Sequence, residues 1–149
     1  MSVATTGPQT VNGALSTGVD GLDDILGGGY AGSHIHLVEG QPGTGKTTLA
    51  LQFLRAGNQR GERGLYITLS ETRDELLAAA TTHGWSLDGI DIYEFVPPEL
   101  SLDPTQEQSV VYAADLELGE TVRMVVAELE RVRPTRVVFD SLADIRLLA

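Results

Sequence analysis

The segment from Gly40 to Thr47 reads GQPGTGKT and fits the pattern G-x-x-x-x-G-K-[ST] at every fixed position. Its glycines adopt backbone angles that other residues resist, so successive backbone amides can curl around phosphate oxygens. A helix that begins near Lys46 directs the positive end of its dipole at the same anion. The pattern predicts a phosphate-binding loop between a strand and a helix. The expected nucleotide-binding residues are Gly40, Gln41, Pro42, Gly43, Thr44, Gly45, Lys46, Thr47 and Thr48.

Lys46 and Thr47 have separate expected roles in such a loop. The Lys46 ammonium can reach the β- and γ-phosphates, and the Thr47 hydroxyl can ligate Mg²⁺. Lys46 is the only lysine among 10 basic residues. The planar fork of an arginine does not replace the compact charge of a lysine, which favours a functional role for this position over chance in an arginine-rich chain.

Composition narrows the classes of protein that remain. A chain of 149 residues that is 42% hydrophobic is typical of one globular domain. Its formal net charge of -11 disfavours nonspecific binding to nucleic acids or anionic membranes. The absence of cysteine excludes disulfides, thiolate zinc sites and cysteine nucleophiles. No apolar run approaches the roughly 18 residues of a membrane span, and no secretory signal begins the chain, so a cytoplasmic location is expected.

Alternating strand and helix patterns predict an α/β domain with a largely parallel sheet. Residues 1–13 lack periodicity and are expected to form a flexible tail before a domain of residues 14–149. Strands are predicted at 34–40, 64–70, 90–95 and 135–142. A first helix is predicted between a Thr17 cap and Gly27, and a second at 46–58. A third is predicted at 72–84, where Thr72 and Glu75 form a capping box. A fourth is predicted at 117–133, with an apolar face of Val122, Val125, Val126, Leu129 and Val132. Residues 97–113 contain three prolines and are expected to form a loop.

Two acidic residues follow predicted strands at the positions that hydrolysis requires. Asp140 ends the apolar stretch VVFD, the form of a Walker B element, and α/β sheets bind ligands at the carboxyl ends of their strands. Asp140 is therefore the expected metal-site carboxylate beside Thr47. Glu71 follows the strand GLYITLS and is the candidate for orienting the attacking water. The alternative for Glu71 is a charge that simply favours the N-terminus of the next helix.

Three segments together resemble the KaiC-like ATPases of the RecA/RadA superfamily, namely STGVDGLDDILGGGYAGSHIHLVEGQPGTGKTTLALQFL, YITLSETRDELLAAATTHGW and VVFDSL. The resemblance covers residues 15–149 in order. It implies a RecA-like P-loop NTPase fold, ATP and Mg²⁺ as ligands, and a hexamer for the full-length protein. It also implies that Glu71 activates water, that Lys46 and Thr47 hold phosphate and magnesium, and that Asp140 supports the metal. Two positions depart from the family pattern: Ser70 stands where a first glutamate is frequent, and Ala31 where a proline is usual.

The same resemblance implies a later strand between the P-loop strand and the Walker B strand, together with basic residues that reach a neighbouring subunit's nucleotide. The sequence ends at Ala149, soon after Asp140, which predicts a domain that is incomplete on its C-terminal side. An open slot in the centre of the sheet would expose unpaired strand edges. Pairing with a second copy, rearrangement or partial disorder is expected to relieve that exposure.

Three functions stay open at this point. The first is Mg²⁺-dependent ATP hydrolysis in a regulatory or signalling role, with catalytic Glu71 and Lys46. The second is a nucleotide-binding assembly module with negligible turnover, which Ser70 and the missing trans-acting groups favour. The third is a RadA-like DNA recombinase, which the acidic charge and the absence of DNA-binding loops disfavour. Protein partners are expected without being identified. His34 and His36 are interpreted as polar strand-end positions, because no third metal ligand is in view.

Overall fold

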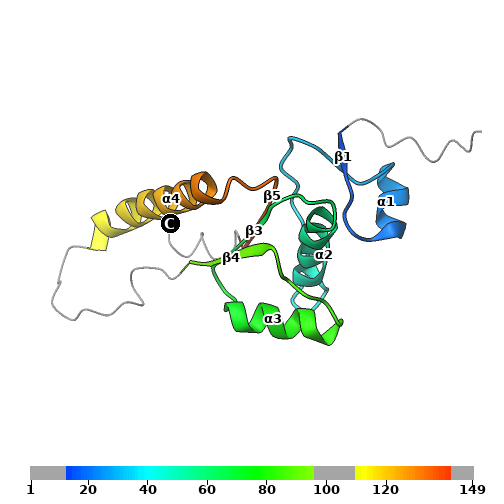
Figure 1. Cartoon of the computed structure of the whole chain (residues 1–149). Helices are drawn as coiled ribbons and strands as arrows, with labels where there is room; N and C mark the ends of the chain where they lie inside the picture. The colour runs from blue at the N-terminus through cyan, green and yellow to red at the C-terminus, as the bar shows by residue number, and fades with distance from the viewer. Residues whose placement is uncertain (1–12, 96–109, 142–149) are drawn as a thin grey trace, which may run out of the picture.

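The computed structural model describes residues 13–95 and 110–141 (Figure 1). The expected tail at 1–13 therefore lies outside the described residues except for Gly13, and so does most of the expected loop at 97–113. Where the two overlap, residues 110–113 are the first turn of a long helix rather than loop. No helix in the described ranges is both long and apolar enough to cross a bilayer.

The described chain alternates strands and helices. Its strands are β1 (Ala14–Leu15), β2 (Tyr30–Ala31), β3 (Gly64–Thr68), β4 (Ile90–Glu94) and β5 (Arg136–Asp140), and its helices are α1 (Asp20–Leu26), α2 (Lys46–Asn58), α3 (Arg73–Thr82) and α4 (Val110–Val132). β1 and β2 form a short antiparallel pair. The main sheet has the order β4-β3-β5 and is entirely parallel. The predicted α/β class with a parallel sheet is confirmed.

The register of the main sheet aligns the C-terminal ends of its three strands. Thr68, the last residue of β3, is the partner of Glu94 at the end of β4 and of Asp140 at the end of β5. Because parallel strands point the same way, these three residues lie at one edge of the sheet. Ligands of open α/β sheets bind at this carboxyl edge.

Side chains that alternate along β3 build one core on each face of the sheet. On one face Tyr66 packs with α2 and α3 in a cluster of Leu51, Leu54, Tyr66, Leu76, Ala80, Leu87 and Ile90. On the other face Leu65 and Ile67 pack against Val132 of α4, with Leu129, Val125, Tyr93 and Phe139 beside them. Figure 1 shows α4 on the side of the sheet away from α2. The helix that carries the end of the phosphate loop is thus held against the face to which Tyr66 points.

Several local predictions are confirmed. α2 has the predicted bounds, from Lys46 to Asn58. α3 begins with the predicted capping box, in which Thr72 and Glu75 satisfy each other's backbone amides, and Gly84 follows its end at φ +68°. The strands predicted from GLYITLS, IDIYEF and TRVVFDSL appear as β3, β4 and β5.

The strand predicted at 34–40 is wrong, because residues 35–40 follow no regular element. Ile35 is fully exposed, and Leu37 and Val38 are 67% and 44% exposed. A strand needs a ladder partner for its backbone groups, and in the described part of the chain none lies beside this segment. β-Forming residues alone therefore do not produce a strand here. The expectation of an open slot in the sheet stays a prediction.

Two helix details also differ from expectation. Thr17 does not cap α1: the N-cap residue is Val19, and the Thr17 hydroxyl instead donates to the Asp23 carboxylate at 2.6 Å. Because the helix starts after Val19, the Thr17 oxygen accepts from the Val19 amide at 3.1 Å and not from an amide of the first helical turn. The apolar face predicted for the second half of α4 is only partly buried, since Val122 and Val126 are 52% and 45% exposed.

Arg136 ties the segment before α1 to the sheet and to α2. Its side chain is completely enclosed, and its Nε donates to Glu62 at 2.6 Å. Its Nη1 donates to the carbonyls of Ser16 at 2.7 Å and Phe53 at 2.9 Å. A buried cation is tolerated only when it is paired and its donors are satisfied, and both conditions hold here. This arginine fixes α2, and with it the start of the phosphate loop's helix, against β5.

Candidate nucleotide site

The glycine-rich loop runs directly into α2. Gly43 and Gly45 have φ values of +80° and +91°, in the region that side chains with a Cβ avoid. Gly45 is the N-cap of α2, so the loop ends where the helix exposes its free backbone amides. A Cβ on Gly40 would lie 2.6 Å from Thr44 Oγ1, so a larger residue here would displace the hydroxyl that closes the turn. The conformation therefore has the turns and the helix start that phosphate binding needs.

Lys46 lies across its own loop. Its Nζ donates to the carbonyl oxygens of Gly40 at 2.8 Å and Gln41 at 3.0 Å. Thr44 closes the same turn, because its hydroxyl donates to the Gln41 carbonyl at 2.8 Å. A phosphate in this loop would compete with two neutral carbonyls for the ammonium, and an anion is the stronger acceptor.

Glu71 and Asp140 are carried by neighbouring strands of the sheet. Asp140 is the last residue of β5, and Glu71 lies in the turn that follows β3. Thr68 holds this turn, since its hydroxyl donates to the Glu71 carbonyl at 2.7 Å and accepts from the Glu71 amide at 3.0 Å. The two carboxylates interact strongly enough for Asp140 to raise the pKa of Glu71. The structure thus brings together the two acidic residues that the sequence suggested.

The pKa of Glu71 is raised above its ordinary value. Partial burial is the largest cause, and the negative charges of Asp140 and Glu75 act in the same direction. The Thr47 hydroxyl opposes the shift, because it lies where it can donate toward the Glu71 carboxylate. Thr47, from the first turn of α2, therefore reaches the same site as the two acids.

Tyr66 is a member of this site that sequence reasoning missed. Its side chain is fully buried, and its hydroxyl donates a 2.6 Å hydrogen bond to Asp140 Oδ2. Burial and the negative charge of Asp140 raise the pKa of Tyr66, so the phenol stays protonated and remains a donor. In the sequence Tyr66 is one more large residue in a buried strand, and only the pairing of β3 with β5 reveals its partner.

The donor set fits a hard divalent cation. Thr47 and Asp140 offer a hydroxyl and a carboxylate, oxygen ligands of the kind that Mg²⁺ prefers, and the Glu71 carboxylate lies beside them. A divalent cation would also relieve the repulsion between the carboxylates of Glu71 and Asp140. Within the described residues no group of three or more histidine, cysteine, aspartate or glutamate side chains is placed to hold a metal. A cation here would therefore take few protein ligands and complete its shell with phosphate and water oxygens, as Mg²⁺ does.

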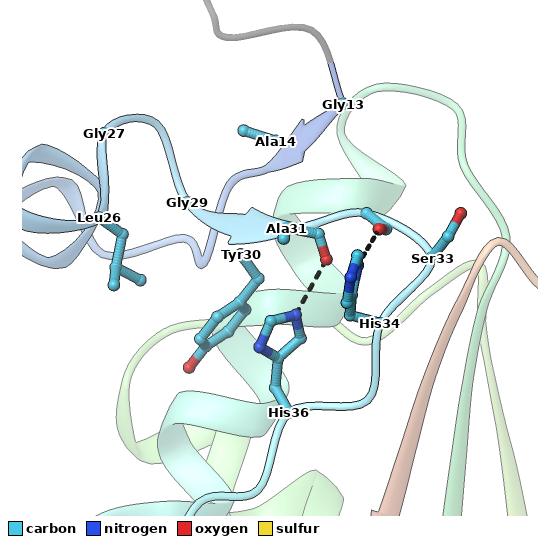
Figure 2. Close-up of a pocket in the computed structure, with 11 residues that line it drawn as sticks. Gly13, Ala14, Leu26, Gly27, Gly29, Tyr30, Ala31, Ser33, His34 and His36 are labelled. Atoms are coloured by element: carbon cyan, nitrogen blue, oxygen red, sulfur yellow. Dashed lines mark hydrogen bonds between the residues drawn. The ribbon is translucent and has the colours of Figure 1, made fainter.

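A separate hollow lies in the segment before the loop (Figure 2). Its volume is about 710 Å³, and β1, β2 and the chain from Gly32 to His36 line it. His36 stacks on Tyr30 with ring centroids 4.7 Å apart, and its Nε2 lies 2.9 Å from the carbonyl oxygen of Ala31. None of the predicted site residues lines this hollow. The candidate site is therefore defined by the loop and the strand ends and not by this hollow.

A glycine-rich loop at the start of a helix, beside a parallel sheet with acids at its carboxyl edge, is the architecture of P-loop nucleotide-binding proteins. The family model described as "ATPase: KaiC" matches residues 15–149. The chain belongs to this family of KaiC ATPases, and the family implies a RecA-like α/β fold.

Individual relatives agree with the family match. The circadian clock oscillator protein KaiC of Picosynechococcus sp. is 32% identical over 135 residues, which cover 91% of this chain and 24% of that protein. The circadian clock oscillator protein KaiC 1 of Synechocystis sp. is also 32% identical over 135 residues, which again cover 91% of this chain and 24% of that protein. The UPF0273 protein of Thermotoga maritima is 32% identical over 139 residues, which cover 88% of this chain and 56% of that protein. The chain thus spans about a quarter of the KaiC relatives and just over half of the Thermotoga protein.

Proposed function

We propose that this chain binds ATP with Mg²⁺ and hydrolyses it, in a regulatory or signalling role. The observation that carries the proposal is the convergence of Thr47, Glu71 and Asp140 beside the start of α2, where the glycine-rich loop ends. Phosphate binding, metal binding and activation of water need these groups within one site. Membership of a family of ATPases supports the same reading.

Each residue has a defined part in the proposed reaction. The backbone N–H groups of residues 40–48, apart from Pro42, cradle the phosphates, and Lys46 exchanges its bonds to the Gly40 and Gln41 carbonyls for the β- and γ-phosphates. Thr47 and Asp140 hold the metal side of the site. When bound, Mg²⁺ supplies positive charge that offsets the charge developing on the transferred phosphoryl group.

Glu71 accepts a hydrogen bond from the attacking water and orients it toward the γ-phosphate. Its raised pKa suits this role, because a more basic carboxylate polarises water more strongly once it is ionised. Thr68 fixes the backbone that carries Glu71 through the two hydrogen bonds across the turn.

A second candidate is a nucleotide-binding assembly module with negligible turnover. Ser70, which is exposed beside Glu71, favours it because this site holds one carboxylate after β3 where related domains often hold a pair. Release of phosphate from ATP in Mg²⁺, compared with the same chain in EDTA and with Lys46→Ala, separates the two. Release above both controls supports hydrolysis, and tight ATP binding without release supports the assembly module.

We also propose that the protein acts as a homo-oligomer, with a hexamer expected for the longer protein. The exposed apolar stretch of Ile35, Leu37 and Val38 supports this, because contiguous exposed apolar side chains mark contact surfaces. Light scattering with and without ATP and Mg²⁺ tests it. A RadA-like recombinase stays disfavoured by the net charge of -11, and a salt-dependent DNA titration tests that alternative.

A further inference from the structure

We propose that Tyr66 is a positioning residue for the metal side of the site, which it serves by holding the Asp140 carboxylate in one orientation. This inference rests on the proposed function, because it assigns Asp140 to a Mg²⁺ site. The observation behind it is the 2.6 Å hydrogen bond from the Tyr66 hydroxyl to Asp140 Oδ2. Nothing in the loop motif or in the Walker B pattern specifies such a donor.

The phenol is held rigidly by the fold. Tyr66 lies in the central strand of the sheet, with Ile92 and Val138 as its partners on either side. Its side chain is fully buried in the cluster that packs α2 and α3 onto the sheet. Asp140 lies two residues beyond Val138 on the same face of β5, so the hydroxyl reaches it along a diagonal. A donor fixed in this way restricts the rotamer of its acceptor.

The Tyr66 phenol lies near both proposed metal ligands. The Tyr66 hydroxyl donates to Asp140, and the Thr47 side chain lies near enough to the phenol to lower its pKa. Tyr66 therefore lies where the first turn of α2 and the end of β5 approach each other, and its hydroxyl is bonded to the β5 side.

The consequence for Asp140 follows from the number of its oxygens. A carboxylate has two oxygen acceptors, and Tyr66 occupies Oδ2, which leaves Oδ1 for a cation or for water that binds one. Hydrogen-bonded partners of metal ligands orient them, and their loss typically weakens metal binding by about 10- to 100-fold. Replacement by phenylalanine keeps the buried ring and removes only this donor.

The test is a Mg²⁺ titration of the whole chain with a fluorescent ADP analogue. Mg²⁺ is expected to increase the affinity for the ADP analogue, and Tyr66→Phe should raise the Mg²⁺ concentration that gives half of this increase by about tenfold. The affinity in EDTA should stay within about twofold of the starting protein, because a lost metal contact does not act in the absence of metal. Tyr93→Phe is the matched control, since Tyr93 lies on the neighbouring strand and packs in the core on the other face of the sheet.

The same substitution made in a chain that lacks the Asp140 carboxylate shows whether Tyr66 acts through Asp140. In an Asp140→Ala chain, Tyr66→Phe is expected to change the Mg²⁺ response no further, because residues of one network are not additive. A starting protein whose ADP affinity is the same in Mg²⁺ and EDTA would overturn the proposed function and this inference together. Mg²⁺-dependent binding that Tyr66→Phe leaves unchanged would overturn the role of Tyr66 alone. An additive effect in the Asp140→Ala chain would equally overturn it.

Discussion

Tyr66 and Asp140 are 74 residues apart in the sequence, and a 2.6 Å hydrogen bond joins them across two neighbouring strands. The pair connects the largest buried core, to which Tyr66 belongs, with the carboxyl edge of the sheet, where Asp140 ends β5. Packing and site geometry are therefore not separable in this domain. A change that shifts β3 relative to β5 moves a proposed metal ligand.

Lys46→Ala is expected to weaken binding of a fluorescent ADP analogue by about 10- to 100-fold, the range for losing a hydrogen bond to a charged group. Lys46→Arg should restore little of this affinity, because a planar guanidinium does not fit where the ammonium now contacts the Gly40 and Gln41 carbonyls. Arg131→Ala, which removes an exposed charge from the end of α4, is the control. Equal affinity in Lys46→Ala and Arg131→Ala would remove Lys46 from the site.

The same substitution is expected to have opposite effects in two helices. A Cβ on Gly57 of α2 would lie 2.5 Å from Arg136 Nε, so Gly57→Ala should destabilise the fold by about 1–3 kcal/mol through overpacking. A Cβ on Gly119 of α4 meets nothing within 4 Å, so Gly119→Ala should stabilise by about 0.5–1 kcal/mol, because alanine loses less backbone entropy than glycine. Urea unfolding measures both changes. A stabilising Gly57→Ala would contradict the close packing around Arg136.

Asp23 is expected to make stability depend on pH. Burial tends to raise the pKa of Asp23, but hydrogen bonds from Ser16 and Thr17 outweigh it and hold the pKa below the ordinary 3.8. Between the folded-state pKa and 3.8 the unfolded chain therefore binds more protons than the folded chain. The stabilisation that Asp23 contributes is full above pH 3.8 and is lost as the pH falls through the folded-state pKa.

Asp23→Asn should accordingly cost about 1.5–3 kcal/mol at pH 7, the range for hydrogen bonds to a charged group. The cost should shrink as the pH is lowered toward that of the depressed pKa, because the carboxylate of the starting protein is then also neutral. Asp24→Asn, an exposed neighbour, is the control. Urea unfolding as a function of pH measures the difference, and a cost that does not change with pH would rule out the charged acceptor as its source.

Local patterns predicted the parts of this fold that depend on local interactions. The bounds of α2 and the capping box of α3 follow from residues within one or two turns of each other, and both are confirmed. Segment 34–40 has the composition of a strand, but a strand is defined by its partner, and no pattern within those residues supplies one. Thr17 likewise has the identity of a cap, while its preference for Asp23 depends on where the chain turns back.

The functionally important residues also fall into two groups, those that a local sequence pattern predicted and those that it did not. The loop, Glu71 and Asp140 were each suggested by their own motif or by their place after a strand, and the structure brings Glu71, Asp140 and Thr47 together. Tyr66 and Arg136 have no such motif. Asp140 is 74 residues from Tyr66, and the partners of Arg136 are 74 to 120 residues from it, so only the pairing of β3 with β5 and the packing of α2 define what they do. Polar residues in otherwise apolar strands are the signal that would have drawn attention to them.

ATP turnover by Glu71→Gln tests the central claim most directly. Glutamine keeps the size of the side chain and removes its basicity, so phosphate release in Mg²⁺ should fall by about 100-fold or more, the range for loss of a general base. Binding of the fluorescent ADP analogue should stay within about threefold, because Glu71 acts on water rather than on the nucleotide. Asp74→Asn, which removes an exposed charge from the first turn of α3, should retain full turnover. Turnover in Glu71→Gln equal to that of the starting protein would contradict the account.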